Sequence, residues 1–168
     1  TVNADHTTTS TEYLLKDSSG NVVNKVITID PNGNRIEYKY DNLGKIQYVK
    51  DLETGIVSAL YEYDNMGRVS TVTDGNGNVY KYTHDKRGRK TGLTVIDTSN
   101  NISYIETYTY TDVDSDGNSV VTKTVGQGEN CIITSAYTNK YGEKVKVSSG
   151  APDNLSVTKY TYDYAGNV

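Results

Sequence analysis

The sequence predicts an all-β chain of tandem antiparallel β-hairpins that continue one another as a long, twisted and spiralling ribbon. Three observations predict this fold class. A turn signal that ends in glycine recurs about every 11 residues over much of the chain, side chains alternate between the turns, and Tyr, Val, Ile and Thr, which favour pleated surfaces, are frequent. No stretch has the residue spacing of an amphipathic helix.

The recurring unit is Tyr-x-Tyr-Asp-x-x-Gly. Complete copies occupy residues 38–44, 61–67 and 160–166, and the copy at 82–88 has His84 in place of the second Tyr. Asp-x-x-Gly alone occurs at residues 17–20, 30–33 and 74–77. The sequence therefore predicts the following structural repeat positions: Tyr38, Tyr40, Asp41, Gly44, Tyr61, Tyr63, Asp64, Gly67, Asp74, Gly77, Tyr82, Asp85, Gly88, Tyr160, Tyr162, Asp163 and Gly166.

Each turn has a physical explanation. The carboxylate of the Asp at the first position accepts backbone N–H groups, as in an Asx-turn. The Gly at the fourth position supplies the positive φ that ends a three-residue hairpin loop in a G1 bulge. Between the turns, Ile36, Tyr38 and Tyr40 are expected on one face of a strand, with Glu37 and Lys39 on the other. Strands of about six or seven residues would be about 20 Å long.

The regularity of the repeat divides the sequence into three parts. Residues 1–12 are rich in Thr and are expected to form a lead-in strand, residues 13–95 carry regular repeats, and residues 96–168 carry degenerate repeats that continue the same ribbon. In the turn at 97–101, Asn is expected to replace Gly, because Asn tolerates a positive φ better than most residues. A longer turn is expected at 150–154.

Composition and charge exclude several classes of function. The net charge is −4 with acids and bases interspersed, so the chain lacks the basic footprint of a nucleic-acid binder. No apolar run approaches the roughly 18 residues of a membrane-spanning helix, so no membrane insertion is expected. Cys131 is the single cysteine, which excludes a disulfide within the chain. No spacing of Cys, Ser and His is typical of a catalytic set, so no catalytic residue and no enzyme activity are expected.

One motif points to a metal ion. Asp112, Asp114 and Asp116 precede Gly117 with the spacing of a calcium loop, in which alternate carboxylates converge on one hard cation. The twelfth position of that loop is Lys123, where an EF-hand has a bidentate Glu. The alternative is an elongated polar hairpin in which Asp114 or Asp116 serves as the Asp of the turn. Calcium is the single cofactor that the sequence suggests.

The repeated units, with Gly-Arg-Val after Met66 and Gly-Asn-Val after Asn76, resemble the tyrosine-aspartate (YD/RHS) repeat family over residues 13–168. In that family, which includes bacterial polymorphic toxins, Tc toxin cocoons, wall-associated proteins and teneurins, strips of hairpins form a hollow shell. The resemblance implies a non-catalytic piece of such a shell, secreted or displayed at the cell surface or cell wall of a bacterium. It implies as partners the remaining repeats of a parent chain and an enclosed C-terminal polypeptide, such as a toxin or effector.

Two further partners are expected from the residues themselves. Rows of Tyr on a sheet face can stack on sugar rings, because the ring is apolar and the hydroxyl is polar. A carbohydrate-binding or adhesive module is therefore the alternative to a scaffold. Strands at the open ends of a sheet need cover, so self-association through the end strands is also expected.

Overall fold

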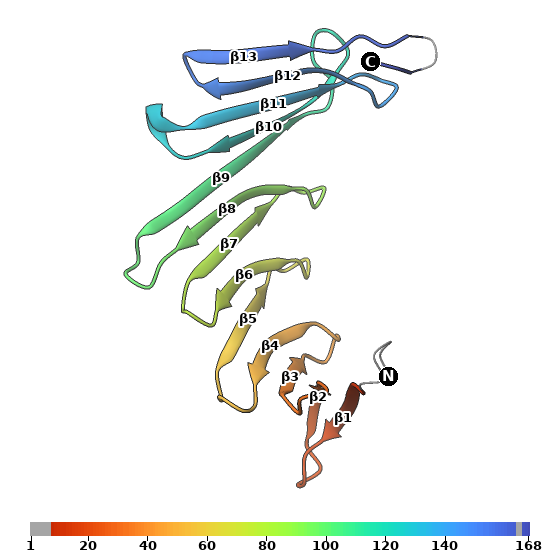
Figure 1. The fold of residues 1–168 in the computed structure, drawn as a ribbon, viewed down its shortest axis with the longest axis vertical. Helices are drawn as coiled ribbons and strands as arrows, with labels where there is room; N and C mark the ends of the chain where they lie inside the picture. Colours follow the sequence, from red (N-terminus) through yellow and green to blue (C-terminus); the bar gives the residue numbers. More distant parts are fainter. Residues whose placement is uncertain (1–7, 164–165) are drawn as a thin grey trace. The chain divides into compact units, whose positions relative to one another are not determined.

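The structure, a computed structural model, describes residues 8–163 and 166–168. These residues contain thirteen β-strands and one short 3-10 helix, so the all-β prediction is confirmed (Figure 1). The strands are β1 (Ser10–Lys16), β2 (Val22–Ile29), β3 (Arg35–Tyr40), β4 (Ile46–Asp51), β5 (Val57–Tyr63), β6 (Val69–Asp74), β7 (Val79–His84), β8 (Lys90–Ile96), β9 (Ile102–Thr111), β10 (Ser119–Val125), β11 (Ile132–Thr138), β12 (Lys144–Ala151) and β13 (Asn154–Lys159). The 3-10 helix, η1, spans Gly128–Asn130.

The sheet follows the order of the sequence. Neighbouring strands are hydrogen-bonded in the order β1 to β13, without a crossover among the described strands. The pairing is antiparallel, as in β2 and β3, where Lys25 lies opposite Lys39 and Ile29 lies opposite Arg35. Each strand therefore pairs with segments that are close to it in the sequence, as expected for tandem hairpins.

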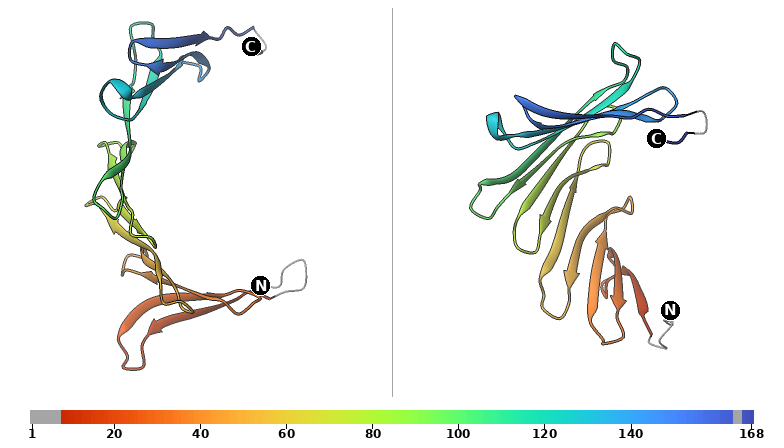
Figure 2. Two further views of the ribbon diagram at one scale, coloured as in Figure 1. Left: turned by 60° about the vertical axis from the view of Figure 1, so that its left-hand side comes forward. Right: turned by 45° about the horizontal axis from the view of Figure 1, so that its top comes forward.

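The chain forms two compact units. The first contains Thr1–Tyr80 together with the turn Asp97–Asn101, and the second contains Lys81–Ile96 and Ile102–Val168. Within each unit the hairpins follow one another as a single layer of strands (Figure 2). The division of the sequence at residues 13 and 96 concerns the regularity of the repeat and stays a prediction. In the predicted lead-in, β1 begins at Ser10, and residues 1–7, including His6, lie outside the described part.

The interior is small and partly polar. Among the described residues, the buried apolar side chains are those of Ile27 and Cys131, with exposures of 4% and 7%. The buried polar residues are Glu37, Glu106, Ser135 and Ser148. A chain with so little apolar interior is stabilised mainly by contacts between neighbouring hairpins, as in other repeat proteins. The described residues form no helix with the length and hydrophobicity needed to cross a membrane.

One turn is tighter than the sequence suggested. Ala151, the last residue of β12, lies opposite Asn154, the first residue of β13, so the loop consists of Pro152 and Asp153. Proline fixes the φ of the first central residue of a β-turn, which allows the chain to reverse within two residues. The longer turn expected at 150–154 is therefore wrong, and the chain forms a two-residue hairpin there.

Candidate functional site

The turn of the repeat is a compact set of hydrogen bonds, and Asp64 shows its geometry. The N–H of Gly67 donates to the carbonyl of Asp64 at 2.8 Å, and the N–H of Asp64 donates to the carbonyl of Arg68 at 2.8 Å. The Asp64 carboxylate accepts the N–H groups of Met66 and Arg68, both at 2.9 Å. One carboxylate oxygen thus satisfies two backbone donors, which explains the preference for Asp at this position.

The same set of contacts recurs along the chain. It is present in the turns that begin at Asp17, Asp30, Asp41, Asp74, Asp85, Asp97, Asp114 and Asn139. The Gly that ends the turn has a positive φ, as at Gly44 (+78°) and Gly88 (+84°). In the turn at 97–101, Asn100 takes this place with a φ of +67°. Glycine is therefore replaceable here by a residue that tolerates the left-handed region.

A side chain at the fifth position of the turn stabilises the charged carboxylate. The Arg68 guanidinium donates to Asp64 at 2.7 Å, and this hydrogen bond, together with the backbone N–H groups, lowers the pKa of Asp64 from 3.8 to about 2. In the turn of Asp74, the amide of Asn78 donates at 3.0 Å, and it likewise lowers the pKa of the Asp74 carboxyl. These carboxylates are therefore ionised at neutral pH and act as hydrogen-bond acceptors.

The second Tyr of the unit joins neighbouring strands. The hydroxyl of Tyr63 donates to the carbonyl of Ile46 at 2.7 Å, and that of Tyr162 donates to the carbonyl of Lys144 at 2.8 Å. In both cases the acceptor is the second residue after the Gly of an earlier turn. The contact thus joins the C-terminal end of one strand to the first residue of the strand that precedes it in the chain.

Tyr110, in the stretched unit of the degenerate region, makes the same contact with the carbonyl of Lys90 at 2.7 Å. The guanidinium of Arg89 lies over the ring of Tyr110, 4.2 Å from its centroid, and the ammonium of Lys45 lies 5.1 Å from the centroid of Tyr63. A cation above an aromatic face adds a further attraction. The hydroxyl of each Tyr therefore binds the neighbouring strand, and its ring contacts the residue that directly precedes that strand.

Glu106, at the centre of β9, is a buried carboxylate with four side-chain partners. Its side chain is 5% exposed and binds the ammonium groups of Lys90 at 2.5 Å and Lys123 at 2.7 Å. It also accepts the hydroxyls of Tyr104 at 2.8 Å and Tyr108 at 3.0 Å. Burial by itself would raise the pKa of Glu106, but these four donors outweigh burial and lower the pKa from 4.5 to about 2.

Glu37 on β3 occupies a similar environment in the first unit. It accepts the ammonium of Lys25 at 3.0 Å and the hydroxyl of Tyr48 at 2.8 Å. Burial opposes ionisation, yet the two hydrogen bonds lower the pKa of Glu37 below its usual value. The sequence indicated the strand face of Glu37 but not its burial. Lys25 lies opposite Lys39 and Lys123 lies opposite Tyr108, so the lysines reach the two glutamates diagonally, and only the pairing register reveals these contacts.

The three predicted calcium ligands make contacts with different groups of the chain. Asp112 binds the guanidinium groups of Arg87 at 2.6 Å and Arg89 at 3.1 Å. Asp114 serves as the Asp of the turn, and the N–H of Asp116 donates to its carboxylate at 2.9 Å. In the part of the chain that the structure describes, no group of three or more His, Cys, Asp or Glu side chains is placed to hold a metal ion. Calcium binding stays a prediction, and it would require Asp112 to leave its two arginines.

The first Tyr of the unit packs against β-branched side chains. Tyr38 lies opposite Val26 on β2 and Val49 on β4, and Tyr61 lies opposite Val72 on β6. Cross-strand pairs of aromatic and β-branched residues stabilise antiparallel sheets. Four other repeat positions are half-buried: Tyr40, Tyr82, His84 and Tyr160.

The chain forms an antiparallel sheet in which successive hairpins repeat the same hydrogen bonds in their turns and the same tyrosine contact. These features define the class of tandem β-hairpin repeat proteins. Residues 63–101 match the family model described as RHS Repeat. This stretch is an RHS repeat, and the resemblance predicted from the sequence is confirmed. No curated protein matches the sequence.

Two crystal structures contain a similar fold. In the structure of TcdB2-TccC3-Cdc42, the similar region has a TM-score of 0.52 and 15% sequence identity, and it covers 92% of this chain and 10% of that chain. The structure of TcdB2-TccC3-TEV gives a TM-score of 0.50 and 14% identity, over 94% of this chain and 10% of that chain. The present chain thus spans about a tenth of the length of each, and at this identity the likeness establishes the fold alone.

Proposed function

We propose that the chain is a non-catalytic structural scaffold, a segment of a YD/RHS-repeat β-shell that encloses or presents a toxin or effector polypeptide. The observation that carries this proposal is the recurrence of contacts that join one strand to the next. Tyr63, Tyr110 and Tyr162 donate to carbonyls of the neighbouring strand, and Glu37 and Glu106 bind lysines of neighbouring strands. Polar groups that an enzyme would use for chemistry here hold the sheet together.

A single-layer sheet suits the role of a wall. Within each unit, the described strands form a single layer, so each hairpin must be stabilised by its neighbours and must tolerate contact with water or with an enclosed polypeptide. Tyrosine meets both needs, because its ring packs while its hydroxyl is hydrogen-bonded or hydrated. The long side chains of Lys90 and Lys123 cover the buried Glu106 carboxylate while their own side chains stay 36% and 39% exposed.

The comparisons support a place in a larger protein. The similar crystal structures are of TcdB2-TccC3 complexes, and the RHS Repeat match supports a bacterial protein that is secreted or displayed at the cell surface. In such a protein, neighbouring repeats would pair with β1 and β13, whose residues are exposed throughout. Self-association of the separate chain would use the same two strands.

Limited proteolysis of the protein that carries this segment with its flanking sequence tests the proposal. An enclosed polypeptide should be cleaved much more slowly within the native protein than when it is produced separately. Equal cleavage rates, with the repeats shown to be folded by circular dichroism, would contradict enclosure. Turnover by this segment in a hydrolase screen would contradict the absence of catalysis.

A further inference from the structure

We propose that a notch in the sheet of the second unit binds an extended peptide that carries a tyrosine. The notch lies where β9 continues beyond the end of β10 (Figure 1), and its volume is about 290 Å³. Ile102, Tyr104, Val125 and Gln127 are among the residues that line it. This volume is close to the lower end of the range of ligand pockets, about 300–1,000 Å³, so a short peptide segment is expected. The site goes beyond the scaffold function and does not depend on it.

The notch exists because β10 is too short to cover β9. β9 has ten residues, whereas β10 has seven, and the last facing pair of the two strands is Val125 and Glu106. One further contact, from the N–H of Gly126 to the carbonyl of Ile105 at 3.0 Å, ends the pairing. Among the described strands, none covers this side of β9 from Ile102 to Tyr104.

The loop after β10 turns away from β9. Gly126 has a φ of +92°, which side chains other than glycine rarely adopt. A Cβ atom at Gly126 would lie 3.2 Å from the Cα of Cys131 and 3.3 Å from the carbonyl oxygen of Asn130, so the loop folds back closely on the start of β11. This departure from the regular turn leaves the beginning of β9 open in the middle of the sheet.

A regular strand is covered up to its first residue. In β3 the carbonyl of Arg35, the first residue, accepts the N–H of Leu52 at 2.9 Å from the turn that follows β4. An edge of a strand without such a neighbour is a template for pairing with another chain. Addition of an extended peptide to such an edge is a common mode of peptide recognition. The open edge at Ile102–Tyr104 is about 10 Å long, which suits a strand of three or four residues.

The repeat itself indicates which side chain would fill the notch. Ile102 is the second residue after Asn100, which has the positive φ of the glycine that ends a turn. At the same place in other hairpins, the carbonyls of Ile46 and Lys90 accept the hydroxyl of a tyrosine from the end of the following strand. The register of the pairing shifts beside Ile46 and beside Ile102 alike, so the two positions are equivalent.

β9 lacks the tyrosine that would make this contact. The strand that follows it, β10, has the sequence SVVTKTV and contains no tyrosine. Tyr104, which lines the notch, donates its hydroxyl to Glu106 instead. A tyrosine of a bound peptide would therefore make at Ile102 the contact that the chain makes for itself at Ile46.

The walls of the notch suit an aromatic ring. The side chain of Ile102 is 54% exposed, and Val125 lies on the opposite wall. Tyrosine packs against such residues elsewhere in the chain, as where Tyr61 lies opposite Val72. Pairs of aromatic and β-branched side chains on neighbouring strands stabilise antiparallel sheets. The ring of the peptide would thus cover apolar surface that is now exposed.

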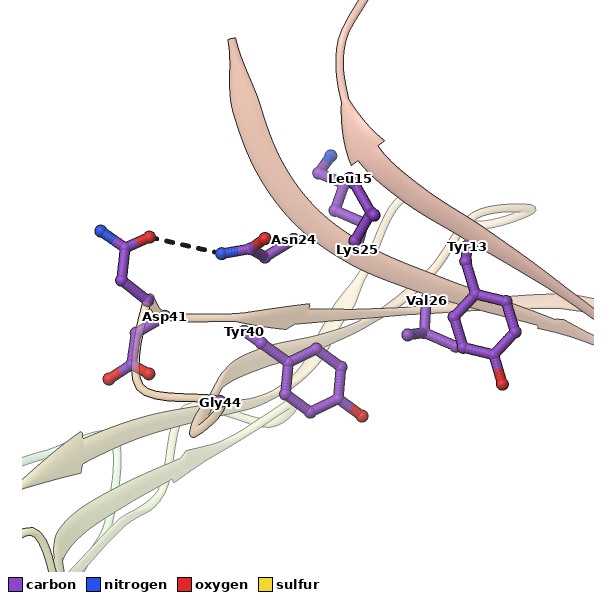
Figure 3. Close-up of a pocket in the computed structure, with 9 residues that line it drawn as sticks. Tyr13, Leu15, Asn24, Lys25, Val26, Tyr40, Asp41 and Gly44 are labelled. Carbon is purple, nitrogen blue, oxygen red and sulfur yellow. Dashed lines mark hydrogen bonds between the residues drawn. The ribbon is translucent and has the colours of Figure 1, made fainter.

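A hollow of similar volume in the first unit does not offer such an edge. It lies at β1, β2 and the turn that follows β3, and Figure 3 shows Val26 and Tyr13 among its residues. Val26 pairs with Tyr13 on β1 and with Tyr38 on β3, so both sides of β2 are already covered there. Addition of a strand is therefore possible at the notch and not at β2 in this hollow.

Two-dimensional NMR titration of the whole chain with the acetylated and amidated peptide Leu-Tyr-Glu-Tyr tests the proposal. This peptide copies residues 60–63, whose last residue makes the contact with Ile46. We expect saturable shifts at the amides of Ser103, Tyr104 and Gly126. The peptide Leu-Tyr-Glu-Phe should bind about fivefold more weakly, because it loses one hydrogen bond to a backbone carbonyl.

Methylation of the peptide nitrogens tests whether binding is strand addition. Every second N–H of an added strand points to β9, and the others point away from it. Methylation of the Leu and Glu nitrogens and methylation of the two Tyr nitrogens should therefore differ in effect. One of the two should weaken binding about tenfold or more, since it removes hydrogen bonds of the ladder, and the other should bind nearly as well as the parent peptide.

Ile102→Ala should also weaken binding, because it removes an apolar wall of the notch. Ile56→Ala is the matched control, since Ile56 is equally exposed at 54% but belongs to the first unit, and it should leave the affinity unchanged. The proposal is overturned if Leu-Tyr-Glu-Tyr gives no saturable shift, or if the shifts are confined to β1 or β13 at the open ends of the sheet. It is equally overturned if the Phe peptide binds as well as the Tyr peptide, if both methylated peptides bind alike, or if Ile102→Ala has the affinity of Ile56→Ala.

Discussion

The hydroxyl of Tyr110 donates a hydrogen bond to the main-chain carbonyl of Lys90 at 2.7 Å, across 20 residues of sequence. The contact repeats at Tyr63 and Tyr162, each time with a carbonyl two residues after the Gly of an earlier turn. It explains why the unit uses Tyr and not Phe at this place. The ring alone could pack, but the hydroxyl is needed to satisfy a carbonyl at the start of the neighbouring strand.

Tyr110→Phe should therefore destabilise the chain by about 1 kcal/mol, the usual net contribution of a hydrogen bond to a backbone group. Urea denaturation measures the effect. Tyr141→Phe is the matched control, since the Tyr141 side chain is 75% exposed, and it should change the free energy of unfolding by less than about 0.5 kcal/mol. Equal stabilities of the two variants would refute the role given to the Tyr110 hydroxyl.

Glu106→Gln should destabilise the second unit by about 1–3 kcal/mol, because it removes the negative charge between two ammonium groups and leaves Lys90 and Lys123 close together. This expected destabilisation is smaller than that for breaking a fully buried ion pair, because both lysines are partly exposed. Glu62→Gln, at an exposed position on β5, is the control and should have little effect. A Glu106→Gln variant with the melting temperature of Glu62→Gln would contradict the account of this cluster.

Stability should fall as the pH is lowered through the acid range. In the folded chain the pKa of Glu106 is about 2, below its ordinary value of 4.5, so between these values the unfolded chain binds more protons. The stabilisation is therefore fully present above about pH 4.5 and is lost as the pH falls towards 2. Urea midpoints measured from pH 7 to pH 2 should drop more steeply for the unaltered chain than for Glu106→Gln. Parallel curves would show that Glu106 does not titrate in this way.

Gly67→Val should destabilise the first unit by roughly 1–3 kcal/mol, because a β-branched side chain strongly disfavours the φ of +79° at this turn. A side chain added at Gly67 would also meet the ammonium of Lys45. Met66→Val, at the preceding and exposed turn residue, tests whether the effect belongs to the backbone conformation. The turn assignment fails if Gly67→Val unfolds at the same denaturant concentration as Met66→Val.

Asn100 offers the reverse experiment. Its φ of +67° lies where Gly is more readily accommodated, so Asn100→Gly should be at least as stable as the unaltered chain, while Asn100→Ala should lose about 1 kcal/mol. Thermal unfolding of the two variants checks the prediction. A more stable Ala variant than Gly variant would mean that the Asn side chain, and not the backbone angle, decides this turn.

Most of the strand and turn pattern could be predicted from the sequence because its causes are local. Asp41 and Gly44 form hydrogen bonds within a few residues, so the turn can be recognised without knowing what lies beside it. The alternation that places Tyr38 and Tyr40 on one face follows from strand geometry alone. The two-residue hairpin at Pro152 and Asp153 was missed because the preceding Gly150 suggested a loop, although it lies within β12.

The carboxylate centres could not be predicted because their causes are not local. Glu37 and Glu106 look like ordinary solvent-facing residues, and each becomes buried when lysines and tyrosines from adjacent strands cover it. Lys123 reaches Glu106 from β10 and Lys90 reaches it from β8, so the pairing register had to be known first. The contacts of Asp112 with Arg87 and Arg89 depend on register in the same way.

The central claim is that the repeated turn folds the chain into an antiparallel sheet in which each strand is held by its sequence neighbours. Nuclear Overhauser effects between backbone protons of facing residues test this claim most directly. The account predicts cross-strand signals between Tyr38 and Val26 in the first unit and between Tyr108 and Lys123 in the second. Signals typical of helix through these segments, or contacts that require parallel pairing of β2 with β3 or of β9 with β10, would contradict it.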